Sequence, residues 1–293
     1  MIDLSSLLTL RAADRTSYVG PASREDHLRA FGGQLIAQAL VAAGNTVTNG
    51  RPCHSLHGYF LRPGNTDQPI TYAVDTVRDG RSFSMRSVDA VQNDKTIFRL
   101  MASFHSDEAG ASQHADPMPD VQPPDQLTPF IELFDNRDDG GVLDRWESRM
   151  KAFDIRFVGV TPFDTAPTEP VNHSQVWIRC STPLNDQLMH RGYFAYISDL
   201  TILDPILLAH GRRWTDGPVI GASLDHAIWF HDDIDMNQWM LFDHHSPVAG
   251  GNRGLAQTTI WNETGRLVAT VVQEALLRPP VLVSRDPLLG SPS

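Results

Sequence analysis

The order of predicted elements in this chain occurs twice. A stretch with helical apolar spacing at residues 31–44 is followed by four strand-like runs, at residues 53–62, 69–78, 82–92 and 96–105. A mostly apolar segment at residues 196–211 is followed by four more, at residues 223–231, 237–245, 254–262 and 266–277. His57 and His226 lie 169 positions apart, as do Asn93 and Asn262, so the repeat has the size of a domain. The pattern predicts two copies of an α+β unit, each with one helix beside antiparallel strands.

Composition excludes several classes of protein. With 41% hydrophobic residues and six Trp, the chain can bury a core and is not a disordered protein. A net charge of −11 argues against a general nucleic-acid or anionic-membrane binder. The two cysteines, Cys53 and Cys180, are too few for a disulfide scaffold and are expected to be buried free thiols. We find no secretory signal and no run of transmembrane length, so the chain is expected to be cytoplasmic, with no membrane partner.

Six stretches resemble, in order, the successive motifs of one known family, the acyl-CoA thioesterase II family. They are FGGQLIAQAL, HSLHGYFLRPGNTDQPITY, RDGRSFSMRSVDAVQNDKTIFRLMASF, QVWIR, SLDHAIWFH and VVQEALLR. The resemblance spans nearly the whole chain and implies a double hotdog, in which each of two long helices is wrapped by a curved antiparallel sheet. It also implies hydrolysis of a fatty acyl-CoA substrate to free acid and CoA.

The expected division of the chain follows from the duplication and from composition. Residues 1–106 form an N-terminal hotdog and residues 151–280 a C-terminal hotdog that carries the catalytic residues. Between them, residues 107–150 are a linker with a partial helix, because Pro, Asp and Ser dominate its first part with almost nothing to bury. Residues 281–293 are expected to be a tail outside the core.

The resemblance implies three catalytic residues. Asp199, Ser223 and Gln273 match the family's aspartate, hydroxyl and glutamine, which together bind and orient one water molecule, with Asp199 accepting its proton. A backbone N–H at a helix N-terminus is a candidate oxyanion donor. A covalent serine route has little support, since residues 221–225 read GASLD and the chain has no G-x-S-x-G elbow.

Each of these residues also has a structural interpretation. Taken alone, Asp199 is interpreted as a helix cap or a solvent-facing carboxylate. Ser223 is interpreted as a turn hydroxyl and Gln273 as a residue on the solvent-exposed face of a strand. Asp204, which precedes Pro205, reads as a helix cap. The functional interpretation of the first three residues therefore depends on the resemblance.

Candidate substrate-binding residues come from the first half. Gly32 and Gly33 permit close backbone approach to a ligand or to a packed strand. His57, read as the counterpart of His226, could line the site, although a structural role is the simpler interpretation. Arg62 and Arg81 are candidates for holding the CoA phosphates, against the alternative that they are solvated surface residues.

No metal or cofactor is expected. His226, His231, His244 and His245 lie near several aspartates, but strand alternation places His226 and His231 on opposite faces. The chain also has no HExxH or CxxC motif. His226 is therefore read as a hydrogen-bonded core residue.

Two alternatives to a thioesterase stay open. One is a non-catalytic acyl-CoA-binding hotdog, and the other is an enoyl-CoA hydratase, although the G-D-x-N-P-x-H type of motif is missing. No basic helix-turn-helix segment suggests a nucleic-acid partner. Because exposed hotdog sheets usually pair with another copy, a homodimer or homotetramer is expected.

Overall fold

The computed structural model describes residues 3–24, 29–48, 50–106, 108, 110, 113–133, 146–147, 149–163, 169–215 and 220–278. The strands of this part form one 13-stranded antiparallel sheet, in the order β1-β2-β4-β5-β6-β3-β10-β13-β12-β11-β8-β7, with β9 also paired to β13. The expected tail at residues 281–293 and most of the predicted partial helix lie outside the described residues.

In the first half, one long helix packs on strands whose side chains alternate between a buried face and a solvent-exposed face. Its elements are α1 (Leu4–Leu8), β1 (Arg11–Ala12), β2 (Ser17–Gly20), α2 (Gly32–Asn45), β3 (Cys53–Phe60), β4 (Ile70–Asp79), β5 (Phe83–Gln92) and β6 (Lys95–His105). In β5 every second side chain is buried, which is the pattern of a sheet with one face on the core. The predicted helix and four strands are present, and the short elements before them were not predicted.

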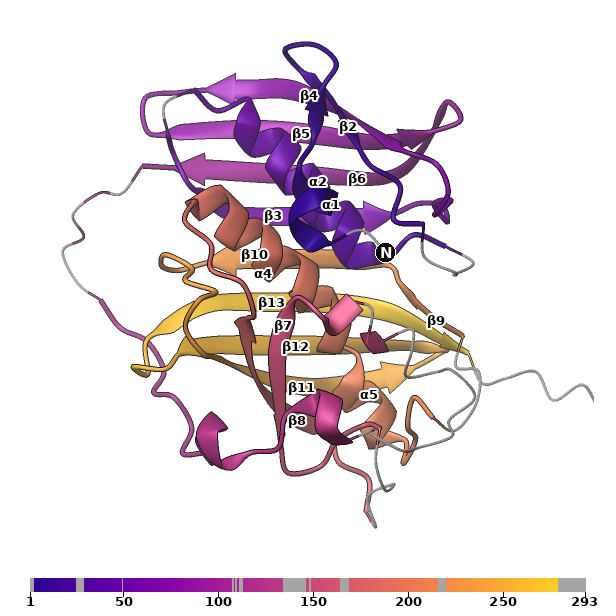
Figure 1. Cartoon of the computed structure of the whole chain (residues 1–293), viewed down its shortest axis with the longest axis vertical. Coiled ribbons are helices and arrows are strands. Elements are labelled where there is room, and N and C mark those ends of the chain that lie inside the picture. Colours follow the sequence, from indigo (N-terminus) through magenta and orange to yellow (C-terminus); the bar gives the residue numbers. More distant parts are fainter. Residues whose placement is uncertain are drawn as a thin grey trace, which may run out of the picture.

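The second half repeats this arrangement on a longer chain. Its elements are two short 3-10 turns, η1 (Pro124–Gln126) and η2 (Phe130–Leu133), then β7 (Phe153–Val158), β8 (His173–Cys180), α4 (Gln187–Thr201), α5 (Asp204–Ala209), β9 (Ile220–Ser223), β10 (Asp225–Phe230), β11 (Met240–Gly250), β12 (Arg253–Asn262) and β13 (Leu267–Arg278). Figure 1 shows β2 and β7, at the two ends of the sheet, running steeply relative to the strands in its middle, with β7 in front of β12 and β13 on the side of the helices. The predicted α+β class, with a helix laid twice on an antiparallel sheet, is confirmed.

The two halves meet along one strand pair and one helix pair. β3 pairs with β10, with His57 opposite Ala227, which makes the two half-sheets continuous. α2 and α4 lie side by side on the same face of the sheet (Figure 1). Their backbones approach closely at Gly33, where a Cβ atom would lie 2.2 Å from the carbonyl oxygen of Tyr196. Only glycine permits this approach.

Helix α4 begins before the predicted segment at residues 196–211 and ends within it, ahead of a proline. Asp186 caps its start by accepting a hydrogen bond from the Met189 N–H, and a break precedes α5, which carries Pro205 in its first turn. Asp204 is not the cap of α5 but its first residue, buried and bonded to the Trp214 indole at 2.9 Å. Residues 187–209 are long and apolar enough to cross a membrane, contrary to the expectation that no run has transmembrane length. However, 94% of the 18-residue apolar window in this segment is buried within the protein.

Part of the expected linker is a packed element. Met118, Val121 and Leu127 cover the outer face of the second half of the sheet, where Trp177 and Trp261 form a small apolar cluster with Leu241. The Trp177 indole donates to the Gln122 carbonyl at 3.0 Å, and the Trp261 indole donates to the Asp116 carbonyl at 3.1 Å. Residues 113–127 are exposed or half-buried, as a stretch with little to bury should be, but its few apolar residues find a partner surface on these strands.

Candidate active site

Asp199 lies on α4 with its carboxylate directed at the first turn of α2. Its exposed fraction is 7%, so it is neither a helix cap nor a solvent-facing residue. A Cβ atom on Gly32 would lie 2.6 Å from Asp199 Oδ2, and the backbone N–H of Gly33 donates to the carboxylate. Since Phe31 provides no side-chain cap for α2, the carboxylate of the second half occupies the electropositive helix end of the first half. The helix end therefore offers a favourable place for a carboxylate that comes from an otherwise apolar segment.

The structure brings the other two predicted catalytic residues to Asp199. The Ser223 hydroxyl donates to Asp199 Oδ1 at 3.0 Å, and Gln273 Nε2 donates to Ser223 Oγ at 2.9 Å. Gln273 also donates to the Asp199 carboxylate. Its side chain is fully buried, so it does not lie on a wet face. An acceptor-only carboxylate with a hydroxyl, an amide and a backbone N–H around it is an arrangement that can hold a water molecule.

A bulge at Leu224 places Ser223 on the buried face. Ser223 pairs with Ala275 through β9, whereas β10 pairs Ala227 with Val272, so the register shifts by one residue between them. Strict alternation would put Ser223 and His226 on opposite faces, and that expectation is wrong. The extra residue re-aims the hydroxyl toward the helix, which is a recurrent use of β-bulges beside functional sites.

Burial shifts the acid–base properties of the site. Removal from water raises the pKa of Asp199 to about 6, while the bonds from Gln273, Ser223 and Gly33 and the charge of Arg149 oppose this shift. A carboxylate with a pKa near 6 is ionised at neutral pH and is a stronger base than an exposed aspartate.

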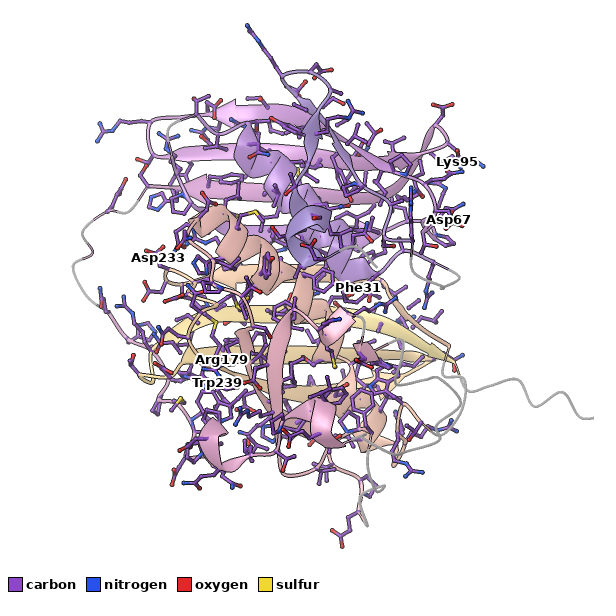
Figure 2. All side chains as sticks on the ribbon, in the orientation of Figure 1. Phe31, Asp67, Lys95, Arg179, Asp233 and Trp239 are labelled. Atoms are coloured by element: carbon purple, nitrogen blue, oxygen red, sulfur yellow. The ribbon has the colours of Figure 1, made fainter. Side chains whose placement is uncertain are left out.

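Two arginines near Asp199 were not predicted. Arg29 donates to the Gly221 carbonyl, and the guanidinium of Arg149 lies 4.5 Å from the centre of the Phe31 ring. Figure 2 labels Phe31, which lies where the two halves meet. Burial lowers the pKa of Arg29, and the charge of Arg149 lowers it further. The charge of Asp199 raises it by less, so the net shift is downward. No sequence pattern identified this pair, because both residues come from stretches without a motif.

The predicted substrate-binding residues divide into two groups. Gly32 and Gly33 adjoin Asp199, as described above. Arg62 lies just beyond the end of β3, exposed, and donates to the Thr96 carbonyl at 2.6 Å. Two residues before it, the Phe60 ring would be 3.0 Å from a Cβ atom on Gly32, so Arg62 follows a residue that contacts the site.

His57 and Arg81 are not brought to Asp199. His57 is exposed on the outer face of the sheet, where its ring meets Trp229 edge-on at 4.8 Å between centres. Arg81 lies in the turn between β4 and β5, and its carbonyl accepts a bond from Arg51. This turn adjoins the Cys53 end of β3, the opposite end from Phe60, because Phe83 pairs with His105 and Phe104 pairs with Cys53.

His57 is not the structural counterpart of His226. β3 ends at Phe60 and β10 ends at Phe230, which sets the offset between these strands at 170 rather than 169. Leu56 therefore occupies the place of His226, and both side chains are buried. A one-residue error reverses the face of a strand residue, so the offset of 169 between the two histidines misaligned the two halves at this strand.

The first half lacks a carboxylate that matches Asp199. Gly44 stands in α2 as far from the helix start as Asp199 stands in α4. It packs against Leu188 in the first turn of α4, just as Asp199 adjoins the first turn of α2. The counterpart of Asp199 is thus Gly44, which has no carboxylate.

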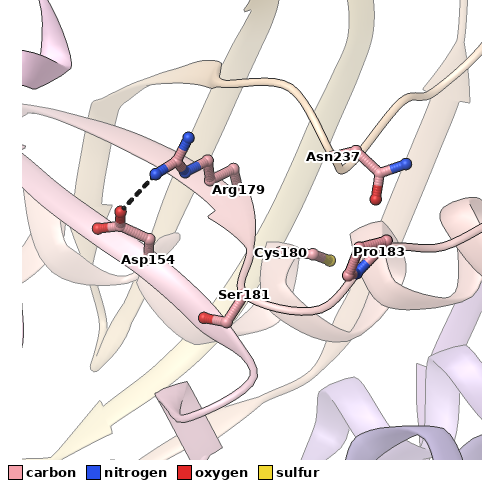
Figure 3. Close-up of a pocket in the computed structure, with 6 residues that line it drawn as sticks. All are labelled: Asp154, Arg179, Cys180, Ser181, Pro183 and Asn237. Carbon is pink, nitrogen blue, oxygen red and sulfur yellow. Dashed lines mark hydrogen bonds and ion pairs between the residues drawn. The ribbon is translucent and has the colours of Figure 1, made fainter.

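A surface hollow lies away from Asp199. It has a volume of about 420 Å³ and is lined by Asp154, Arg179, Cys180, Ser181, Pro183 and Asn237 (Figure 3). Arg179 and Asp154 form an ion pair at 3.2 Å across it, and burial raises the pKa of the Cys180 thiol to about 12. A thiol with that pKa is a poor nucleophile, so this hollow offers no chemistry comparable to that around Asp199.

Within the described residues, no three His, Cys, Asp or Glu side chains converge as metal ligands would. His226 bonds to Gln273 and His231 to Thr270, so the nearby histidines have separate partners.

Comparison with known proteins identifies the family of this chain. Residues 21–105 match the model of the acyl-CoA thioesterase N-terminal domain, and residues 115–277 match that of the acyl-CoA thioesterase C-terminal domain. The chain belongs to the acyl-CoA thioesterase family. The second match begins within the stretch that covers the outer face of β8, β11 and β12, so this stretch goes with the second half.

Three similar proteins illustrate the relationship. Human acyl-coenzyme A thioesterase 8 is 35% identical over 297 residues, with 97% of this chain and 92% of the human protein covered. The crystal structure of acyl-CoA thioesterase II TesB2 from Mycobacterium marinum is 36% identical, with a TM-score of 0.79 and coverage of 95% of this chain and 99% of that one. A protein of unknown function with a hot dog fold from Alicyclobacillus acidocaldarius is 20% identical with a TM-score of 0.77, covering 94% and 98%. The predicted family and the double hotdog are confirmed.

Proposed function

We propose that this protein hydrolyses fatty acyl-CoA by direct attack of a water molecule held by Asp199, Ser223 and Gln273. The observation that carries the proposal is the buried carboxylate with a raised pKa, bonded to a hydroxyl and an amide at the end of a helix. The family to which the chain belongs, and the names of its relatives, support the substrate class.

The proposed chemical step moves one proton and breaks one bond. Asp199 takes a proton from the water as its oxygen bonds to the thioester carbonyl carbon, which leaves a tetrahedral oxyanion. First-turn N–H groups of a helix have no partners within the helix, and in α2 only that of Gly33 is used by Asp199. Another of these N–H groups is proposed to donate to the oxyanion. Collapse of the intermediate breaks the C–S bond, and the CoA thiolate takes up the proton that Asp199 had accepted, which restores the carboxylate.

Glycine at position 32 supports this placement of the substrate. The space beside the carboxylate would be filled by any side chain there, since a Cβ atom would lie 2.6 Å from Asp199 Oδ2 and 3.0 Å from the Phe60 ring. That space adjoins both the base and the end of α2, where a reacting carbonyl must sit. Cytoplasmic location and assembly into a dimer or tetramer remain part of the proposal.

We expect the purified protein to release free CoA thiol from saturated fatty acyl-CoA, with kcat/KM falling as the pH falls through about 6. Activity falls at low pH because the pKa of Asp199 in the folded protein is raised to about 6, so protonation removes the base below that pH. The measurement is thiol release against pH from 4.5 to 8.5 for acyl chains of 4 to 18 carbons.

Two outcomes would contradict the proposal. Binding of acyl-CoA without thiol release at any chain length would indicate a non-catalytic binding protein. Loss of enoyl-CoA absorbance with no thiol released would indicate a hydratase. A lipid-free sample of the Asp199→Asn variant serves as the matched control for contaminating thioesterases.

A further inference from the structure

A buried histidine stands directly behind the proposed site and has no role in the step above. His226 has an exposed fraction of 1%, and both of its ring nitrogens have partners. Nδ1 is hydrogen-bonded to Gln273 Oε1, and Nε2 lies 3.0 Å from Ser198 Oγ. Ser198 precedes Asp199 on α4, so the contacts form a closed path from α4 through β10 and β13 back to α4.

The ring is neutral and therefore carries a single N–H. Burial lowers the pKa of His226 to about 4, although the bond to Gln273 opposes this shift. At neutral pH one nitrogen donates and the other accepts, and the partners decide which.

The Asp199 carboxylate determines the direction of every bond in this path. A carboxylate only accepts, so the edge of the Gln273 amide that faces it must be the Nε2 donor, as found. Gln273 Oε1 then faces His226 and requires a donor, which places the proton on Nδ1. Nε2 then accepts, and the Ser198 hydroxyl can donate to it by turning from the Ala195 carbonyl, which is its other acceptor.

The opposite orientation of the Gln273 amide has a cost at the site. It would aim Oε1 at Asp199 and Ser223 and would require His226 to carry its proton on Nε2, which Ser198 could accept while donating to Ala195 O, 3.0 Å away. Inside a buried network the amide has two self-consistent orientations, and only one of them supports the carboxylate. The tautomer of His226 selects between them.

We propose that His226 is a positioning residue: its Nδ1–H holds the Gln273 amide with Nε2 toward Ser223 and Asp199. The inference rests on the proposed function, since it deepens the same site. It adds one residue, His226, that contacts neither the water nor the substrate.

We expect His226→Leu to lower kcat for acyl-CoA hydrolysis by about 10- to 100-fold, the range found when a partner that orients a functional ligand is removed. KM should stay within about two-fold, because the substrate does not touch this residue. His226→Asn should recover most of the activity, since its Nδ2–H can take the place of Nδ1–H. His244→Leu is the matched control, because His244 is equally buried on β11, bonds to Thr258 and should leave kcat unchanged.

A double-variant cycle separates positioning from general structural damage. His226 acts through Gln273, so adding His226→Leu to Gln273→Leu should change kcat by less than about two-fold. Multiplication of the two losses would overturn the proposal, as would equal losses for His226→Leu and His226→Asn.

A spectroscopic measurement decides the matter even without turnover. Nitrogen-15 NMR of the histidine-labelled protein at pH 7 should show His226 neutral with its proton on Nδ1. A proton on Nε2, or on both nitrogens, would overturn the inference. A wild-type protein that releases no thiol would contradict the proposed function instead, and the two failures are thereby distinguishable.

Discussion

Asp199→Asn is expected to lower kcat for acyl-CoA hydrolysis by about 10³-fold, within the range that loss of a positioned general base produces. The amide cannot accept the proton of the attacking water, yet it nearly preserves the volume of the buried carboxylate. Because Ser223, Gln273 and the end of α2 remain in place, acyl-CoA binding should change by less than about three-fold. Thiol release and calorimetric titration with a non-hydrolysable thioether analogue provide the two readouts. Loss of binding in parallel with loss of turnover would assign Asp199 to substrate affinity instead.

The same substitution should stabilise the fold at neutral pH. The folded pKa of Asp199, about 6, lies above its ordinary value of 3.8, so the folded state holds this proton more tightly than the unfolded chain. Folding stability from this group is therefore lost as the pH rises from about 4 to about 6, and Asp199→Asn removes that loss. Above pH 6 the variant should gain up to about 2–3 kcal/mol in the free energy of unfolding. Below pH 4 the gain should vanish, and urea unfolding at pH 4 and pH 7.5 tests both limits.

Gly33→Ala is expected to destabilise the folded protein by more than about 3 kcal/mol. A Cβ atom here would lie 2.2 Å from the Tyr196 carbonyl oxygen and 2.4 Å from the Phe31 ring. The first contact is with backbone, so no side-chain rotation relieves it and α2 must move away from α4. The movement also withdraws the Gly33 N–H from Asp199. Thermal unfolding and thiol release should both show the loss.

Gly192→Ala is the control for that substitution. It lies in α4 at the same helix interface, but its Cβ atom would meet only the side-chain ends of Leu8 and Val41, each at 3.3 Å. Alanine also gains about 1 kcal/mol of helix propensity over glycine, so the net effect should be small. Equal destabilisation by the two variants would show that the α2–α4 approach at Gly33 has no special role.

Much of the fold could be predicted because burial imposes clear periods on the sequence. Strands such as Phe83–Gln92 alternate strictly, and the helix at residues 32–45 has an apolar surface all along its length, so both were predicted near their observed places. The order of the elements in the two halves then led to the duplication and to the fold class.

Features that depend on contacts between distant segments could not be predicted in this way. The bulge at Leu224 is set by the pairing of β9 and β10 with β13, and no local residue pattern marks it. The linker residues that cover Trp177 and Trp261 have few apolar side chains, so composition alone described them as solvated. Arg29 and Arg149 reach Asp199 from segments about 120 positions apart, and only the fold brings them together.

The candidate site shows the same division. The resemblance identified Asp199, Ser223 and Gln273, and the structure brings them within hydrogen-bonding distance. It did not identify the helix end that receives the carboxylate or the residue behind Gln273, because a motif does not record which groups a side chain meets across a sheet.

The measurement that tests direct water attack most sharply is a single turnover of acyl-CoA by excess enzyme in water labelled with oxygen-18. If water held by Asp199 attacks the thioester, the product acid carries one labelled oxygen after one turnover, and peptides containing Asp199 and Ser223 carry neither label nor an acyl group. Label in the Asp199 carboxylate would show attack by the carboxylate itself through an anhydride. An acyl group trapped on Ser223 would show a covalent serine route, and either result would contradict a water held by Asp199, Ser223 and Gln273 as the nucleophile.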